Sequence, residues 1–222
     1  MKIIVVIPAF NEAKSIQKVI RDVKTVVPDV IVIDDGSSDG TADLARSEGA
    51  LVYQHILNRG LGGALGTGLV AALRQKADCI VTFDADGQHL PQDIMRMVQL
   101  IAEGKADVVI GSRLKEFQKM PFRRRLYNDV ANIITLMLFG MRTTDSQSGL
   151  RAFSRESAKK IRLRTNKMEV SSEFMKEIYT HRLRLVEIPI KPIYTQYSMS
   201  KGQNFFVGIK TLIRLIVLRF MK

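Results

Sequence analysis

The sequence predicts an α/β fold in which a mostly parallel sheet is flanked by helices on both faces. Five short apolar runs lie within residues 1–112, at 3–7, 30–33, 51–53, 79–83 and 107–110. Segments with helical spacing separate these runs, and strands that alternate with helices form parallel sheets whose crossover helices cover both faces. A chain of 222 residues is long enough to bury the core of one such domain with an appendage.

The helices between the strands are predicted from apolar spacing and from the residues at their ends. Ile16, Val19, Ile20 and Val23 recur at helical spacing, and Pro28 ends that helix. This helix is predicted at 13–26, further helices at 42–47 and 91–102, and two further extended segments at 181–188 and 192–197.

A glycine-rich stretch at 58–68 begins a further helix. Its spacing matches neither the dinucleotide-binding fingerprint nor the P-loop, because no Lys-Ser or Lys-Thr pair follows the glycines. Small residues at the start of a helix permit close approach of the backbone to another segment or to a phosphate. We therefore expect tight packing near a bound nucleotide, with direct phosphate binding as the alternative.

Acidic or amide side chains follow three of the predicted strands. Asn11 follows the first strand, Asp34 and Asp35 end the second, and Asp84 and Asp86 follow the fourth. The carboxyl ends of parallel strands meet at one edge, where open α/β folds bind ligands. Two carboxylates one residue apart repel each other unless a cation lies between them, and Mg²⁺ or Mn²⁺ suits such oxygen donors. A polar turn is the alternative for the acid pair alone; three converging strand ends favour the metal.

The charge of the chain is divided unevenly. Residues 1–112 carry 11 Lys and Arg against 14 Asp and Glu, whereas residues 113–222 carry 23 against 8. The basic second half indicates an anionic partner, and without interleaved aromatic residues it favours a membrane surface or a phosphorylated ligand over nucleic acid. The single cysteine, Cys79, excludes an intrachain disulfide and suits a reducing compartment.

Several motifs occur in order along residues 1–155. They are Pro8-Ala9-Phe10-Asn11-Glu12, Val32-Ile33-Asp34-Asp35-Gly36-Ser37-Ser38-Asp39-Gly40-Thr41, Asp84-Ala85-Asp86-Gly87-Gln88-His89, Gly111-Ser112-Arg113 and Asp145-Ser146-Gln147-Ser148-Gly149-Leu150-Arg151-Ala152-Phe153. Together they resemble the family 2 inverting glycosyltransferases, and within these the polyprenyl-phosphate hexose synthases. The resemblance implies a Rossmann-like GT-A fold and transfer of a hexose from a GDP- or UDP-sugar to a polyprenyl phosphate, with Mg²⁺ or Mn²⁺ as cofactor.

The same resemblance implies a donor site and a metal site at the strand ends. Asp35 or Asp34 would contact the base or the ribose of the nucleotide. Asp84 and Asp86, with Gln88, would hold the divalent cation on the donor diphosphate. The remaining residues of the implied nucleotide pocket are Pro8, Phe10, Asn11 and Glu12.

The resemblance also implies basic residues that contact the donor diphosphate and the acceptor phosphate. Arg113 follows the fifth strand and would face phosphate, and Lys201 would close over the donor phosphates. Arg124 would clamp the acceptor phosphate, although Arg123 and Arg125 lie near enough to take that role. The implied catalytic residues are Asp86, Arg113 and Arg124, and the implied acceptor side comprises Arg124, Arg125, Asp145 and Ser148.

Two kinds of acceptor remain open. A lipid phosphate is already an anion near neutral pH, so its transfer needs positioning rather than a strong base. A hydroxyl acceptor would need a carboxylate to take its proton, and Glu173 or Asp145 are the candidates. A nucleotidyltransferase is disfavoured because its glycine-rich loop is missing after the first strand, and a non-catalytic binding module is disfavoured by the intact acid pair.

The basic second half suggests attachment to a membrane. A helix at 121–141 could be an ordinary core helix or could lie on a bilayer, and the apolar, basic segment at 205–222 has the composition of an in-plane anchor or of a helix packed on the domain. Neither has the roughly 20 apolar residues that a spanning helix needs. We expect a catalytic core at 1–155, its completion at 156–202, a basic amphipathic helix at 203–222, and peripheral attachment at the cytoplasmic membrane face or through a separate integral membrane protein.

Overall fold

The computed structural model describes residues 1–113, 129–130, 132–133, 136–137, 140–166 and 169–193. Its centre is a seven-stranded sheet with the strand order β3-β2-β1-β4-β6-β5-β7. The strands are β1 (Ile3–Ala9), β2 (Val30–Asp34), β3 (Leu51–Gln54), β4 (Cys79–Thr82), β5 (Val108–Ser112), β6 (Arg151–Ser154) and β7 (Leu185–Pro189). All neighbouring pairs are parallel except those of β6, which runs antiparallel to both β4 and β5. The predicted mostly parallel sheet is therefore confirmed.

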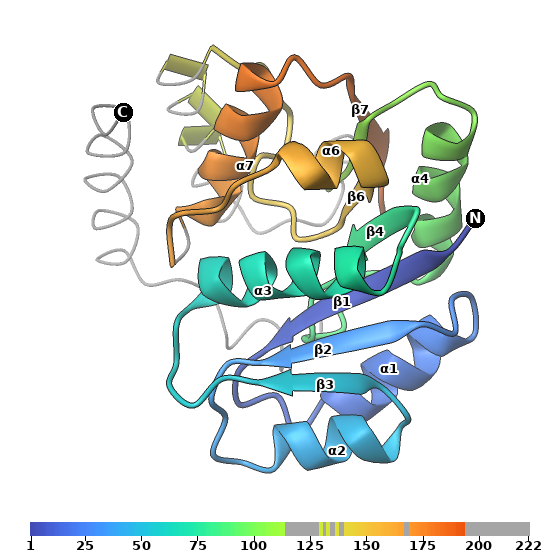
Figure 1. The fold of residues 1–222 in the computed structure, drawn as a ribbon. Helices are drawn as coiled ribbons and strands as arrows, with labels where there is room; N and C mark the ends of the chain where they lie inside the picture. The colour runs from blue at the N-terminus through green and yellow to red at the C-terminus, as the bar shows by residue number, and fades with distance from the viewer. Residues whose placement is uncertain (114–128, 131, 134–135, 138–139, 167–168, 194–222) are drawn as a thin grey trace.

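Helices cover both faces of the sheet (Figure 1). On one face, α1 (Ile16–Lys24), α2 (Thr41–Ser47) and α4 (Gln92–Ala102) pack on side chains such as Val5 and Ile7 of β1. On the other face, α3 (Leu61–Arg74), α6 (Arg155–Lys160) and α7 (Val170–Thr180) pack on side chains such as Ile4 and Val6. Successive residues of a strand point to opposite faces, so a strand buried on both sides reads as a continuous apolar run.

Two features of the sheet differ from the sequence-based expectation. The strand β6 was not expected, and it separates β4 from β5, which the sequence leaves as consecutive parallel strands. The expected extended segment at 181–188 corresponds to β7, whereas most of the segment at 192–197 lies outside the described residues. Across the described part of the chain, no helix combines the length and the apolar character needed to cross a membrane.

The topology brings the motifs to one edge. The strands β2, β1 and β4 are adjacent and parallel, so their carboxyl ends lie side by side. Because β5 is also parallel to these strands and β6 is reversed, β5 ends and β6 begins at that same edge. The segments that follow β1, β2, β4 and β5 and the segment that precedes β6 therefore surround one region.

Candidate functional site

A cavity of about 360 Å³ lies at the carboxyl ends of β1, β2 and β4. The predicted convergence of the three strand ends is confirmed, because Glu12, Asp35, Asp84 and Asp86 all face this cavity. Its complete lining is Pro8, Ala9, Phe10, Glu12, Asp35, Asn58, Gly60, Leu61, Ala64, Asp84, Ala85 and Asp86. We call it the strand-end cleft.

Four of the predicted donor residues that the structure describes, Asn11, Asp34, Gln88 and Arg113, do not line the strand-end cleft. Asn11 joins the loops after β1 and β2: its backbone N–H donates to Ser37 Oγ at 2.9 Å, and its Oδ1 accepts from Ser38 N at 3.0 Å. Asp34 is fully buried at the end of β2, where its Oδ2 accepts from Ser37 N at 3.3 Å. Of the two adjacent acids, Asp35 is thus the one that faces the cleft.

Asp35 anchors the segment that leads into α3. Its Oδ1 lies 2.7 Å from His55 Nδ1 and accepts from Arg59 N at 2.9 Å, and its Oδ2 accepts from Gly60 N at 2.6 Å. The other ring nitrogen of His55 lies 2.9 Å from Thr67 Oγ1 in α3. The His55 contact was not predicted, because it joins residues that are distant in sequence.

Two glycines of α3 allow close packing against neighbouring segments. A Cβ atom at Gly62 would lie 1.9 Å from the carbonyl oxygen of Thr165, and one at Gly68 would lie 2.2 Å from Val6 Cγ1 in β1. Both distances are far shorter than any normal carbon contact. The structure therefore shows the tight packing that the sequence predicts, whereas its relation to a bound nucleotide stays a prediction.

The two acids after β4 have different surroundings. Asp84 Oδ2 lies 3.0 Å from Nε2 of the buried His89, and Asp86 accepts from the backbone and side-chain nitrogens of Gln88 at 3.0 and 2.6 Å. Burial and the neighbouring charge of Asp84 raise the pKa of Asp86. Burial opposes ionisation of Asp84 too, but His89, Arg113 and Arg151 together hold the pKa of Asp84 below its ordinary value.

This acid pair fits a divalent cation. Burial and, after it, the charge of Asp84 raise the pKa of Asp86, and a bound cation would relieve both effects. Within the described ranges, no group of three or more His, Cys, Asp or Glu side chains is arranged to hold a metal ion. A cation here would therefore take its other ligands from a bound ligand and water, as Mg²⁺ does beside phosphates. Gln88 is bonded to Asp86, and its role as a metal ligand stays a prediction.

Gly149 leaves the space that the Asp84 carboxylate occupies. A Cβ atom at position 149 would lie 2.1 Å from Asp84 Oδ1 and 2.2 Å from Oδ2. The backbone at Gly149 is held in place by β4, because Thr82 Oγ1 donates to the Gly149 carbonyl oxygen at 2.7 Å. The segment before β6 therefore forms one wall of the acid site.

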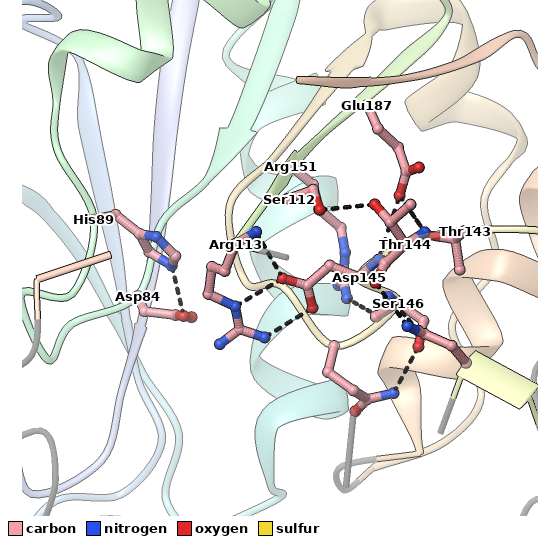
Figure 2. Close-up of polar contacts among 12 residues, drawn as sticks. Asp84, His89, Ser112, Arg113, Thr143, Thr144, Asp145, Ser146, Arg151 and Glu187 are labelled. Carbon is pink, nitrogen blue, oxygen red and sulfur yellow. Dashed lines mark hydrogen bonds and ion pairs between the residues drawn. The ribbon is translucent and has the colours of Figure 1, made fainter. Parts of the chain in front are cut away.

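Arg113 and Asp145 form a buried, two-pronged ion pair (Figure 2). Arg113 Nε and Nη2 donate to the two carboxylate oxygens at 2.8 and 2.9 Å, and the backbone N–H of Arg113 donates to Oδ2 at 3.0 Å. Figure 2 shows the guanidinium lying between Asp145 and Asp84. Such paired hydrogen bonds fix both the position and the plane of a guanidinium. The predicted phosphate-facing arginine is thus held at the edge of the acid site.

The segment 143–146 that carries Asp145 is itself fastened from two sides. Glu187 Oε1 of β7 accepts from Thr143 Oγ1 at 2.6 Å and from Thr144 N at 2.8 Å. Asn132 donates to the Thr144 carbonyl oxygen at 2.6 Å and accepts from Ser146 N at 2.9 Å. The two partners, Asn132 and Glu187, lie far apart in the sequence, so sequence spacing could not reveal these contacts.

Arg151 is a buried cation that sequence reasoning did not assign. Its side chain on β6 donates to the Ser146 carbonyl oxygen at 2.9 Å, and its guanidinium carbon lies 4.6 Å from the centre of the Phe174 ring. Burial lowers the pKa of Arg151 to about 10, although Asp84 and Asp145 oppose that shift. An arginine within an otherwise apolar run was the only signal in the sequence.

The remaining predicted site residues either do not line the strand-end cleft or lie outside the described residues. Glu173 is buried and accepts from Arg164 N and Thr165 N at 2.9 Å each, so its carboxylate fastens a loop. Ser148 is buried beside Asp145, and its hydroxyl has no hydrogen-bond partner among the described residues. Arg124, Arg125 and Lys201 lie outside the described residues.

The fold and the strand-end cleft define an α/β protein with a pair of acids at the carboxyl edge of its sheet, and this pair fits a divalent cation. The model of the family described as "Glycosyl transferase family 2" matches residues 4–162. The chain therefore belongs to glycosyl transferase family 2.

Named relatives match along nearly the whole chain. An uncharacterized protein of Methanocaldococcus jannaschii is 49% identical, over 97% of this chain and 91% of its own length. The UDP-N-acetylglucosamine–dolichyl-phosphate N-acetylglucosaminyltransferase of Methanococcus voltae is 38% identical, over 99% and 97%. The undecaprenyl-phosphate mannosyltransferase of Micrococcus luteus is 32% identical, over 94% and 90%.

Solved structures share the fold. Glucosyl-3-phosphoglycerate synthase from Mycobacterium tuberculosis, solved in complex with Mn²⁺, UDP and glucosyl-3-phosphoglycerate, superimposes with a TM-score of 0.76 at 21% identity. The match covers 98% of this chain and 79% of that one. At this level of identity the likeness establishes the GT-A-like α/β fold alone.

Proposed function

We propose that the protein transfers a hexose from a nucleotide-diphosphate sugar to a polyprenyl phosphate, with inversion and with Mg²⁺ or Mn²⁺, at the cytoplasmic face of the membrane. The observation that carries the proposal is the acid pair Asp84 and Asp86, which lies beside Asp35 in one cleft. Family membership and two relatives named for dolichyl-phosphate and undecaprenyl-phosphate acceptors support it.

The chemistry of the donor agrees with the charges at the cleft. Breaking the bond between sugar and diphosphate develops negative charge on the nucleotide leaving group. A divalent cation bound at Asp84 and Asp86 would supply electrostatic stabilisation of that charge. Arg113 adds a second, fixed cation, because Asp145 determines the orientation of its guanidinium. The buried Arg151 helps to keep Asp84 ionised.

The chemistry of the acceptor favours a phosphate over a hydroxyl. A phosphate oxygen is already an anion, so the chain has only to position it. The two carboxylates considered as bases for a hydroxyl are both engaged: Glu173 accepts from the 164–165 backbone, and Asp145 is paired with Arg113. The proposal therefore assigns Asp145 the positioning of Arg113 rather than proton transfer.

A transfer assay tests the proposal directly. The full chain is incubated with GDP-, UDP- and dTDP-hexoses, with Mn²⁺, Mg²⁺ or EDTA, and with either a polyprenyl phosphate or the corresponding polyprenol. We expect one nucleotide class to give a metal-dependent polyprenyl-phosphate sugar whose anomeric configuration, read by NMR, is inverted. Transfer to the polyprenol alone would establish the hydroxyl alternative, and no turnover with any donor would refute the proposal.

A matched pair of variants tests the acid site. Asp86→Asn should lower transfer about a hundredfold or more, because the cation would lose a charged ligand. Asp43→Asn is the control, since Asp43 lies in α2 with 86% of its side chain exposed and its carboxylate pairs with Arg46 of the same helix. It should leave the rate unchanged. Retained activity in Asp86→Asn would remove the metal role from this residue.

A further inference from the structure

Two adjacent apolar side chains protrude from the loop between β3 and α3. Ile56 is 98% exposed and Leu57 is 75% exposed, so the described residues leave most of both side chains uncovered. Within the part of the chain that the structure describes, most large apolar side chains are buried in the two cores on either side of the sheet. An exposed apolar pair of this kind marks a site of interaction when the backbone cannot fold it inward.

The backbone of this 55–60 loop is held at several points. His55 N donates to the Asp34 carbonyl oxygen at 2.8 Å, and Arg59 N and Gly60 N both donate to the Asp35 carboxylate. Beneath its tip lies Gly36, where a Cβ atom would come within 3.2 Å of the Leu57 carbonyl carbon. The fold therefore presents Ile56 and Leu57 outward from a fixed base.

The loop stands at the mouth of the strand-end cleft. Asn58 and Gly60, which directly follow the tip, line the cleft itself. In Figure 1 the connection between β3 and α3 lies on the side toward which β1, β2 and β3 point. A second exposed apolar pair, Ile133 and Met137, belongs to the segment that Asn132 fastens to residues 144 and 146. The second half of the chain therefore also carries exposed apolar side chains, on a segment joined to the loop that holds Asp145.

We propose that Ile56 and Leu57 insert into the lipid bilayer and hold the mouth of the strand-end cleft against the headgroup layer. The inference rests on the proposed function, because a polyprenyl phosphate presents its phosphate at that layer. Residues 55–60 contain Arg59 and no acidic residue, which suits anionic headgroups. A protein partner is disfavoured, because two side chains supply far less than the roughly 800 Å² per partner of a standard protein interface.

The absence of tryptophan from the chain gives this inference a direct test. Leu57→Trp places a single fluorescent indole at the tip, and Val70→Trp places one on α3, where Val70 is 49% exposed. With vesicles of phosphatidylcholine and phosphatidylglycerol, emission from position 57 should shift to shorter wavelength and be quenched by brominated acyl chains. Emission from position 70 should not change.

Two outcomes of the fluorescence test would overturn the inference. One is an unchanged spectrum of Leu57→Trp on vesicles that bind the protein in a sedimentation assay. The other is a shift without vesicles that grows with protein concentration, which would assign the tip to contact with a second copy of the chain. Circular dichroism of each variant establishes that it is folded before the spectra are compared.

Activity separates this inference from the proposed function. The double variant Ile56→Ser, Leu57→Ser should lower transfer to a vesicle-embedded polyprenyl phosphate by roughly tenfold or more. Its transfer to a short, water-soluble isoprenoid phosphate should match that of the unmodified chain, and Val70→Ser should match it with both acceptors. Equal losses with both acceptors would refute membrane insertion, whereas an unmodified chain inactive with both would refute the proposed function and leave the fluorescence result standing.

Discussion

Position 149 requires glycine because the Asp84 carboxylate leaves no room there for a Cβ atom. Because a methyl group there would overlap both Asp84 carboxylate oxygens, Gly149→Ala should push this carboxylate away from its position beside His89. We expect transfer to fall by about a hundredfold, since displacements of about 1 Å at a reacting centre have effects of this size. Steady-state kinetics with the donor that the transfer assay selects, together with thermal unfolding, would measure both consequences.

A second glycine provides the control for that prediction. A Cβ atom at Gly66 would meet only Leu163 Cβ, at 3.9 Å, which is an ordinary contact. Gly66→Ala lies within α3 and should keep full activity while stabilising the fold by about 0.4–1 kcal/mol. If Gly149→Ala kept its activity as well, the wall that residue 149 forms would have no bearing on the acid site.

At the scale of single residues, the sequence identifies the groups that face the ligand better than those that support them. Asp84, Asp86 and Asp35 could be predicted because each follows a recognisable strand. His89 beside Asp84, His55 beside Asp35 and the buried Arg151 could not be assigned roles, because their partners come together only in the folded chain. Spacing along the sequence predicts which residues lie at the edge of the sheet. It does not predict which side chains contact the carboxylates of those residues.

At the scale of elements, one ion pair joins the starts of β5 and β7. Asp107 accepts from the backbone N–H of Arg184 at 2.8 Å and from its guanidinium at 2.9 and 3.0 Å. The hydrogen bond from the Arg184 side chain is the largest cause that lowers the pKa of Asp107 below its ordinary value of 3.8. A lowered pKa means that ionised Asp107 stabilises the fold above this pH and that the contribution is lost as the pH falls further.

Asp107→Asn should therefore lower the melting temperature by roughly 1–4 °C at pH 7, as expected for a partly exposed pair. The difference from the unmodified chain should shrink as the pH falls below about 4, where both folded forms lose the charge contribution. Calorimetric scans between pH 7 and pH 3 would measure it, with Asp43→Asn as the exposed control. A difference that widens in acid would contradict the assigned cause.

Most elements of the described sheet are predictable, and the exception has a physical reason. Runs of Ile and Val at β1, β2, β4 and β5 predict strands because buried parallel strands are apolar on both faces. The strand β6 has four residues, includes an arginine and follows a polar loop, so no periodicity distinguishes it. Its place between β4 and β5 depends on contacts with strands that lie far away in sequence.

At the scale of the whole molecule, Cys79 can report global unfolding. It is fully buried in β4, and burial raises the pKa of its thiol to about 12. The thiolate is the reactive form, so a thiol reagent at pH 8 should not react with Cys79 in the folded protein. Labelling should occur only in molecules that have unfolded, at the rate of unfolding. Mass spectrometry over a denaturant series would follow the reaction. Rapid labelling in native buffer would show that the centre of the sheet opens locally.

The charge asymmetry predicts how the full chain responds to salt. With 23 basic residues against 8 acidic ones in residues 113–222, binding to anionic vesicles should weaken as ionic strength rises from 0.1 to 0.5 M. Sedimentation with vesicles that contain or lack phosphatidylglycerol would measure this dependence, and the zwitterionic vesicles should show little of it. Binding to anionic vesicles that does not change with salt would exclude an electrostatic contribution.

The reversed direction of β6 determines where the segment between β5 and β6 leaves the sheet and rejoins it. Because β5 ends and β6 begins at the same edge, the chain leaves that edge after Ser112 and comes back to it at Arg151. Residues 113–150 thus leave and rejoin the sheet at two fixed points. We propose that replacing this segment with that of a relative would change the acceptor of the transfer, because Asp145 lies within it whereas Asp35, Asp84 and Asp86 lie outside it.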